Sequence, residues 1–302
     1  MRHTLRQTTP RADNDRPALV TPDWLTGHLD DPEVRVIEVD VSPAAHDQGH
    51  IPGAVLWNIY TDIKDENYDF VGRTAFEELV RQSGIDKGAT VVFYGYAPAF
   101  GFWLLRLFGH DDVRILDADR ATWQAEHHPW TSATSVPAPS QYILGQELPA
   151  LRASLTDVRD GIDEPALTTI DVRSTPEYLG ERFWPSGGMH PDGRAGHVPD
   201  AVSLPADAYV DERGAFRSWD ELSQQFPEFD GSKTDPLITY CTIGARACTA
   251  WFVLSELLGH HDVRVYDGSW AQWGRTAAAP VDTGEPGASR RKLGDRLGVT
   301  CS

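Results

Sequence analysis

Short apolar runs rich in β-branched residues alternate along the chain with segments of helical character. In the first half, such runs cover residues 34–41, 90–94 and 113–116, and an apolar segment typical of a helix covers residues 102–108. Strands that alternate with helices form βαβ units, in which helices cover both faces of a mainly parallel sheet. The pattern therefore predicts an α/β fold.

The alternation occurs twice, because the chain contains an internal repeat. Three blocks recur in the same order: VIEVDVS at 36–42 as TIDVRST at 169–175, GHIPGAV at 49–55 as GHVPDAV at 196–202, and LFGHDDVRILDADRATW at 107–123 as LLGHHDVRVYDGSWAQW at 257–273. With two copies of roughly 130 residues each, the repeat indicates two globular domains and not a solenoid of short units.

A proline-rich segment separates the copies and suggests the domain boundaries. Residues 127–142 read HHPWTSATSVPAPSQY, with three prolines and many small residues, as is typical of an extended connector. The end of the chain is also rich in small and polar residues, which is typical of a loosely packed tail. We therefore expect a first domain at 17–130, a linker at 131–143, a second domain at 144–280 and a tail at 281–302.

The composition narrows the classes of partner. A chain of 302 residues with 40% hydrophobic residues is able to bury two cores. Its formal net charge of −18 repels a phosphate backbone, so nucleic acid is not an expected partner. Residues 1–16 lack the apolar core of a signal peptide, and no apolar run reaches the length of a membrane span. We therefore expect a cytoplasmic protein that does not bind a membrane.

The three cysteines, Cys241, Cys248 and Cys301, are an odd number without the spacing of a metal site. In a reducing compartment they remain thiols. We expect no metal ion and no cofactor. Cys248 falls within a predicted helix, where a packing role is expected, and Cys301 falls in the tail, where no role is expected.

Cys241 follows directly on an apolar run, residues 237–240, and opens the sequence CTIGARACTAWF. A cysteine at the end of a buried strand is commonly a core residue. Here small residues follow, Gly244 is able to adopt a positive φ, and a helix is expected to start near Arg246 or Ala247. The N–H groups of such a loop, the helix dipole and the Arg246 guanidinium favour the thiolate, which is the form that attacks sulfur.

The first copy lacks this chemistry. Alignment on the strand places Gly95 opposite Cys241. The first copy is also shorter between strand and helix, because Gly95 to Leu107 is 12 positions whereas Cys241 to Leu257 is 16. The second copy is therefore predicted to carry a catalytic thiol and the first to be non-catalytic, so that function depends on the loop and not on the fold alone.

With these features the chain resembles the rhodanese family, specifically the tandem-domain thiosulfate sulfurtransferases. GHIPGA, GHVPDA, IDVRS, YCTIGARA, ELLGHHDVRVYDGSW and the duplication carry the resemblance, over residues 18–280. It implies two tandem rhodanese-like domains, the first non-catalytic and the second catalytic. It also implies a Cys241 persulfide that moves a sulfane sulfur from thiosulfate or a related donor to a thiophilic acceptor, cyanide or a thiol. The implied partners are small-molecule donors and acceptors, together with a thiol protein as an acceptor.

The resemblance further implies roles for single residues. Cys241 is the nucleophile, and Arg246 is the cation of the loop. The backbone cradle around the sulfur comes from the other loop residues: Thr242, Ile243, Gly244, Ala245 and Ala247. Arg194, in GRAGHVP, stands where relatives carry an arginine that contacts the anionic donor, with a solvated loop charge as the alternative. From the first copy, Tyr96 or Phe100 is a candidate for the wall of the entrance, with simple packing as the alternative.

Two loop positions depart from the family pattern and keep alternatives open. Thr242 stands where thiosulfate-using relatives often carry arginine, and Arg246 stands where mercaptopyruvate-using relatives tend to have threonine. A cradle with one cation fewer attracts a dianion less, so thiosulfate is expected to be a poorer donor here. The alternatives are a 3-mercaptopyruvate sulfurtransferase or a pathway-specific persulfide carrier. A cysteine-dependent phosphatase is more distant, because its loop needs one residue more between cysteine and arginine than the four found here.

Overall fold

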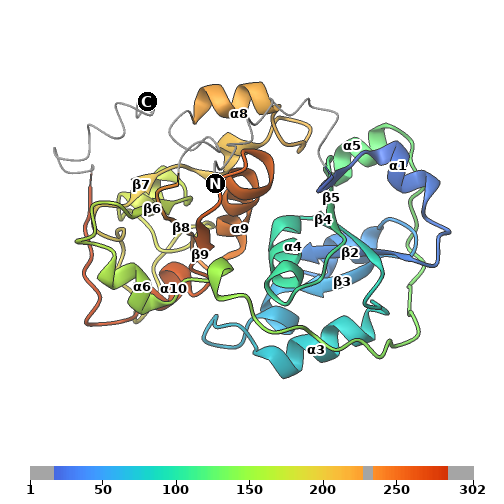
Figure 1. Cartoon of the computed structure of the whole chain (residues 1–302), viewed down its shortest axis with the longest axis horizontal. Helices are drawn as coiled ribbons and strands as arrows, with labels where there is room; N and C mark the ends of the chain where they lie inside the picture. Colours follow the sequence, from blue (N-terminus) through green and yellow to red (C-terminus); the bar gives the residue numbers. More distant parts are fainter. Residues whose placement is uncertain (1–16, 227–233, 285–302) are drawn as a thin grey trace, which may run out of the picture.

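The computed structural model describes residues 17–226 and 234–284 of the chain. From residue 285 on, the expected tail at 281–302 lies outside the described residues, and so does Cys301. Figure 1 shows the two copies side by side, with the first at the right and the second at the left. Among the described helices, none is long and apolar enough to cross a membrane.

Within the described residues, the first copy builds a five-stranded parallel sheet in the order β1-β5-β4-β2-β3. Its elements are β1 (Leu19–Val20), α1 (Pro22–Gly27), β2 (Val34–Asp40), α2 (Ala44–Gln48), β3 (Val55–Asn58), η1 (Ile59–Ile63), α3 (Arg73–Gln82), β4 (Thr90–Gly95), α4 (Pro98–Leu107), β5 (Val113–Leu116) and α5 (Arg120–Ala125). The three predicted strands are β2, β4 and β5. The predicted helix at 102–108 is α4, which begins earlier because Pro98 is at its first position and favours a helix start.

The second copy repeats this plan with four parallel strands in its described part, in the order β7-β6-β8-β9. Its elements are η2 (Pro149–Leu151), α6 (Leu155–Asp160), β6 (Thr168–Asp171), α7 (Thr175–Tyr178), β7 (Val202–Ser203), η3 (Ala206–Tyr209), α8 (Trp219–Gln225), β8 (Leu237–Tyr240), α9 (Ala245–Phe252), η5 (Val253–Leu257), β9 (Val263–Val265) and α10 (Ser269–Trp273). Strands β6 to β9 correspond to β2 to β5. The predicted class, two tandem α/β domains on parallel sheets, is confirmed.

The segment between the copies lies along the first copy. Thr131 pairs with His50 through two backbone hydrogen bonds of 2.8 and 3.0 Å. Further along, the guanidinium of Arg81 donates to the carbonyl of Tyr142 at 2.8 Å, and the Tyr142 and Leu144 side chains are buried in the core. The segment expected as a linker at 131–143 is thus held against the first copy near both of its ends.

The two copies share a core where α4 and α9 pack against each other between the sheets (Figure 1). Phe102 of α4 meets Phe252 of α9 edge to face, with ring centroids 4.9 Å apart. Apolar side chains from both copies form one buried cluster across this contact. Because α9 follows β8 after a short loop, the contact brings that loop next to the first copy.

Candidate active site

Cys241 lies directly after β8, at the C-terminal end of a central strand of the second sheet. The chain then turns at Gly244, which has φ +95° and caps the N-terminus of α9. A Cβ atom at Gly244 would lie 2.7 Å from the carbonyl oxygen of Asp267. The loop therefore needs glycine here for two reasons, the left-handed conformation and the close approach of another backbone. The predicted positive φ is confirmed.

Hydrogen bonds from two helices fix the position of the cysteine. The N–H of Gly244, at the start of α9, donates to Sγ of Cys241 across 3.1 Å. The N–H of Cys241 donates to Oγ of Ser269 at 3.0 Å, and its carbonyl accepts from the N–H of Trp270 at 2.9 Å, both at the start of α10. An N–H group on the sulfur at a helix N-terminus stabilises negative charge there. This part of the expected cradle is present.

A small cavity of about 30 Å³ opens onto Cys241, which is 1% exposed. Its walls come from both copies: Val41, Tyr60 and Tyr96 from the first, and Trp184, Pro185, Thr242, Ile243, Ala245 and Arg246 from the second. This is about the space of one water molecule in the liquid, so it holds one sulfur atom bound to Cys241. Of the two aromatic candidates for the wall, Tyr96 lines the cavity, and Phe100 is fully buried in the core.

Arg246 is bound by a buried carboxylate, Glu177, that sequence reasoning missed. Its Nη1 and Nη2 atoms donate to Oε2 and Oε1 of Glu177 at 3.0 and 2.8 Å. Oγ1 of Thr242 accepts from Nη2 of Arg246 and donates to Oε1 of Glu177, both at 2.7 Å. Burial alone raises the pKa of Glu177, but the hydrogen bonds and charge of Arg246 outweigh it and lower the pKa to about 2. The ionised carboxylate therefore neutralises the cation of the loop at neutral pH.

An insertion in the second copy supplies the outer wall of the cavity. The segment between the repeated motifs is 21 positions long at 175–196 but seven positions long at 42–49. The longer segment brings Trp184 and Pro185 to the cavity. The Trp184 ring also packs against Tyr68 of the first copy, with ring centroids 5.1 Å apart. The insertion thus forms part of the cavity wall and contacts the first copy. Sequence reasoning missed Trp184 and Pro185 too.

The structure does not bring Arg194 or Ala247 to the cavity. All three guanidinium nitrogens of Arg194 donate to backbone carbonyls at 2.6 to 3.4 Å, those of Trp273, Gly274, Thr276 and Ala279. Arg194 therefore holds the chain after α10 and is not placed to contact a donor. Ala247 is fully buried within α9, where its carbonyl accepts from Oγ1 of Thr239 at 3.0 Å. The other candidates lie at the cavity or on the sulfur: Thr242, Ile243, Gly244, Ala245 and Arg246.

Cys248 lies in α9 and is fully buried in the shared core. Burial raises the pKa of its thiol well above the ordinary value. Cys241 opens onto a cavity, whereas Cys248 is a neutral thiol among apolar side chains. This environment agrees with the packing role expected for Cys248.

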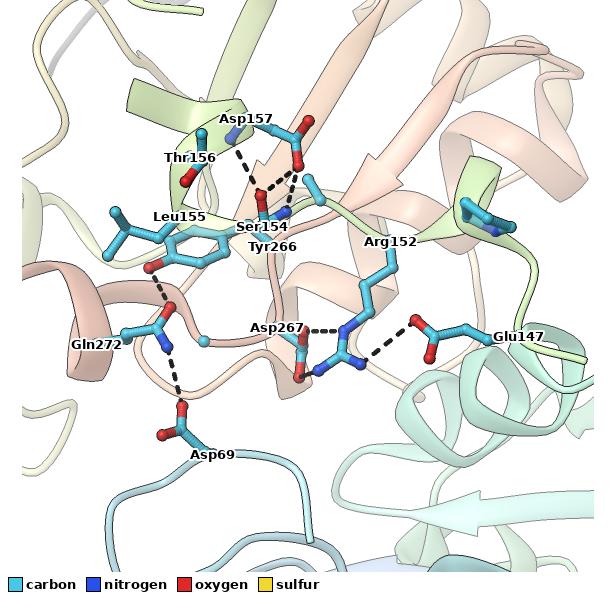
Figure 2. Close-up of a pocket in the computed structure, with 13 residues that line it drawn as sticks. Asp69, Glu147, Arg152, Ser154, Leu155, Thr156, Asp157, Tyr266, Asp267 and Gln272 are labelled. Carbon is cyan, nitrogen blue, oxygen red and sulfur yellow. Dashed lines mark hydrogen bonds and ion pairs between the residues drawn. The ribbon is translucent and has the colours of Figure 1, made fainter. Parts of the chain in front are cut away.

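A larger cavity of about 480 Å³ lies between the copies, apart from the one at Cys241. Figure 2 shows the guanidinium of Arg152 between the carboxylates of Asp267 and Glu147. The side chain of Gln272 likewise links the Tyr266 hydroxyl to the Asp69 carboxylate. These polar groups are paired with one another, and Cys241 does not line this space. The cavity at Cys241 is therefore the candidate active site.

The site suits attack of sulfur on sulfur better than phosphate chemistry. Among the described residues that line the small cavity, none is a histidine or a carboxylate that would protonate a leaving group. Four residues lie between Cys241 and Arg246, and the space beside the thiol is about that of one water molecule. The phosphatase alternative is therefore disfavoured by the lack of such an acid among these lining residues as well as by the loop length.

Comparisons with known proteins match both copies of the repeat. A family model described as Rhodanese-like domain matches residues 21–126 and again residues 154–276. SseA of Mycobacterium bovis, provisionally named a thiosulfate sulfurtransferase, is 40% identical over 277 residues, covering 88% of this chain and 91% of that protein. The sulfur carrier protein TtuD of Thermus thermophilus is 36% identical over 276 residues, covering 88% of this chain and 97% of that protein.

Solved structures show the same fold. SseA of Escherichia coli, described as a 3-mercaptopyruvate sulfotransferase, matches with a TM-score of 0.71 and 26% identity, over 84% of this chain and 98% of that one. The anaerobic ergothioneine biosynthesis enzyme of Chlorobium limicola matches with a TM-score of 0.76 and 23% identity, over 90% of this chain and 72% of that one. The second likeness concerns the fold alone.

Proposed function

The chain belongs to the rhodanese family, and we propose that it is a sulfurtransferase with Cys241 as its nucleophile. The donor is thiosulfate or a related compound with a sulfane sulfur, and the acceptor is cyanide or a thiol. The observation that carries the proposal is the position of Cys241 at a cavity of about 30 Å³, with the Gly244 N–H on its sulfur.

Sulfur transfer consists of two displacements at sulfur. The Cys241 thiolate attacks the outer sulfur of thiosulfate, and the new Sγ–S bond forms as the donor S–S bond breaks. Sulfite leaves with the electron pair of that bond. Cyanide then attacks the terminal sulfur of the persulfide, which yields thiocyanate and restores the thiolate. Charge balances in each step, and no oxidant or reductant is consumed.

The geometry supports each half of this cycle. The Gly244 N–H and the N-terminus of α9 stabilise negative charge on Sγ before attack and on the persulfide afterwards. The cavity has room for the added sulfur and little for bulk water. We assign the catalytic role to the second copy, residues 144–280, and a supporting role to the first, residues 17–130. From the first copy, Tyr60 and Tyr96 complete the wall.

Two relatives favour narrower versions of the same activity. The Escherichia coli structure is that of a 3-mercaptopyruvate enzyme, which favours mercaptopyruvate as an alternative donor. The Thermus thermophilus relative is a sulfur carrier protein, which favours a protein thiol as the acceptor of the Cys241 persulfide. An enzyme turns over repeatedly with small molecules alone, whereas a carrier stops after one sulfur atom.

The test is steady-state thiocyanate formation from cyanide, with thiosulfate or 3-mercaptopyruvate as the donor. We expect repeated turnover with ping-pong kinetics, and a loss of at least about a thousandfold in Cys241→Ser. Cys248→Ala is the matched control and should keep most of the activity, because Cys248 does not line the cavity. Turnover in Cys241→Ser within tenfold of wild type would refute the assignment of the nucleophile. A single turnover by wild type would identify a carrier.

A further inference from the structure

We propose that the Cys241 cavity selects sulfur donors of low charge, favouring an alkyl persulfide over the thiosulfate dianion. The inference rests on the proposed function and specifies its donor class. It is carried by two observations: the cation at the cavity is paired with a buried carboxylate, and the described lining residues include no second cation.

The cation at the cavity is already paired. Arg246 is the one cation among the described residues that line the cavity. Its two terminal nitrogens are held by Glu177 at 3.0 and 2.8 Å, and Nη2 also donates to the Thr242 hydroxyl at 2.7 Å. The Glu177 side chain is fully buried. Turning Arg246 toward a sulfonate would leave that carboxylate unpaired in the interior, which is costly. A dianionic donor therefore meets no unpaired cationic side chain among the described lining residues.

The other walls offer little to a sulfonate group. Ile243 and Pro185 carry no side-chain donor, and the Trp184 indole and the two tyrosine hydroxyls are neutral donors and not cations. Burial raises the pKa of the Tyr60 and Tyr96 hydroxyls, so both remain neutral. A sulfonate at this cavity would therefore meet neutral groups and the paired Arg246, and no second cation among the described lining residues. A slender alkyl group instead matches the walls.

The chemical step with an alkyl persulfide is balanced. The Cys241 thiolate attacks the terminal sulfur of R–S–SH, and the Sγ–S bond forms as the donor S–S bond breaks. The electron pair of the broken bond leaves with R–S⁻, and the hydrogen remains on the transferred sulfur. One negative charge is present before and after the step. The leaving thiolate is singly charged, whereas sulfite carries two charges out through the same mouth.

The first test needs no substitution. The persulfide of 2-mercaptoethanol and thiosulfate are each mixed with wild type, and single-turnover sulfur gain is followed by mass. Each rate is divided by the rate of free cysteine with the same donor, which removes the intrinsic reactivity of the donor. We expect the acceleration to be at least about tenfold larger for the persulfide. An equal or larger acceleration for thiosulfate would overturn the inference. Absence of sulfur gain from both donors would instead refute the proposed function.

A charge series separates selectivity from structure. Glu177→Gln leaves Arg246 unpaired and should raise the thiosulfate-to-persulfide rate ratio about tenfold, the effect of one charge-assisted contact. Arg246→Gln leaves the Glu177 carboxylate without its cation and should lower the thiosulfate-to-persulfide rate ratio. The double variant is uncharged, and its ratio should return to within about twofold of wild type. If all three variants lost the same fraction of the transfer rate with both donors, the pair of Glu177 and Arg246 would be purely structural and the inference would be refuted.

Discussion

Glu177 determines what the loop is able to offer a substrate. Its Oε2 accepts from the N–H and the hydroxyl of Ser174 at 3.1 and 2.7 Å, which caps α7. The same carboxylate binds Thr242 and Arg246. Thr242 is therefore not an open position from which a cation is missing, because it is buried and hydrogen-bonded. The expected weakness toward thiosulfate stays a prediction, and we propose the pairing of Arg246 as its physical reason.

The stability of the fold should depend on the ionisation of Glu177. Its pKa of about 2 in the folded protein lies below the ordinary 4.5, so the ion pair stabilises the fold fully above about pH 4.5 and less as the pH falls toward 2. The shift corresponds to about 3 kcal/mol in the free energy of unfolding. Denaturant unfolding of wild type and Glu177→Gln should therefore differ at neutral pH and converge in acid. A difference that does not change with pH would contradict the ion pair.

The sequence supported the prediction of Cys241 and Gly244 but not of Glu177. Cys241 and Gly244 are recognisable because their roles follow from local order, a strand that ends, a turn and a helix that begins. Glu177 follows Ser174 by three positions, a pattern that a capping box explains on its own. Its second role depends on Arg246, 69 positions away, which no local pattern reports.

The loop between β8 and α9 differs from its counterpart in the first copy, whereas the neighbouring strand, β2 or β6, carries an acidic residue in an ion pair in both copies. Glu38 of β2 pairs with Arg120 of α5. At the equivalent position, Asp171 of β6 pairs with Arg173 at 2.6 Å. The two acidic residues are equivalent and buried, but the arginines come from different positions of the copies, so each copy pairs its carboxylate in its own way.

Gly244→Ala should disrupt the loop, and Gly259→Ala is its matched control. Both glycines have a positive φ, +95° and +78°, so alanine costs about 1 kcal/mol at either position. Only at Gly244 does the new Cβ also meet a backbone atom, at 2.7 Å from Asp267, whereas nothing lies within 4 Å at Gly259. We expect Gly244→Ala to cost about 1–3 kcal/mol more in unfolding free energy and to slow persulfide formation. Equal effects of the two substitutions on both quantities would contradict this.

At the level of the whole molecule, a buried ionic group joins the copies behind the loop. Nζ of Lys64, from the first copy, donates to the carbonyl of Asp267 at 2.9 Å and lies 3.4 Å from its carboxylate. Arg152 binds the same carboxylate at 2.8 Å. Burial raises the pKa of Asp267, but the two cations outweigh it and hold the pKa below its ordinary value. The carbonyl that Lys64 binds is the one that Gly244 packs against.

Lys64→Met should therefore weaken the whole molecule. The substitution leaves a buried carbonyl unpaired and Asp267 with a single cation, at a cost of about 2–3 kcal/mol in unfolding free energy. Lys87→Met is the control, because Lys87 is exposed and its loss should change stability by less than about 0.5 kcal/mol. Urea unfolding of both variants measures the difference. Similar stability in the two variants would show that the ionic group does not hold the copies together.

The duplication and the parallel sheets were predictable, but the arrangement of the copies was not. Repeated blocks and the alternation of strands and helices are local patterns that the sequence contains, and they predicted the duplication and the parallel sheets. Lys64 and Asp267 are 203 positions apart, and the Trp184 contact with Tyr68 joins an insertion to a loop of the other copy. Such contacts depend on how the two domains pack, so the walls that Tyr60, Trp184 and Pro185 supply were not foreseen, whereas Tyr96 and the residues of the loop were.

The central claim, that Cys241 carries the sulfur, is tested most directly by intact mass. Wild type and Cys241→Ser are incubated briefly with thiosulfate and then freed of the donor. Their intact masses are measured, and peptide mapping locates any added sulfur. We predict a gain of one sulfur atom on the wild-type peptide that contains Cys241, its loss when cyanide is added, and no gain in Cys241→Ser. No gain in wild type, or a gain that maps to Cys248, would contradict the account.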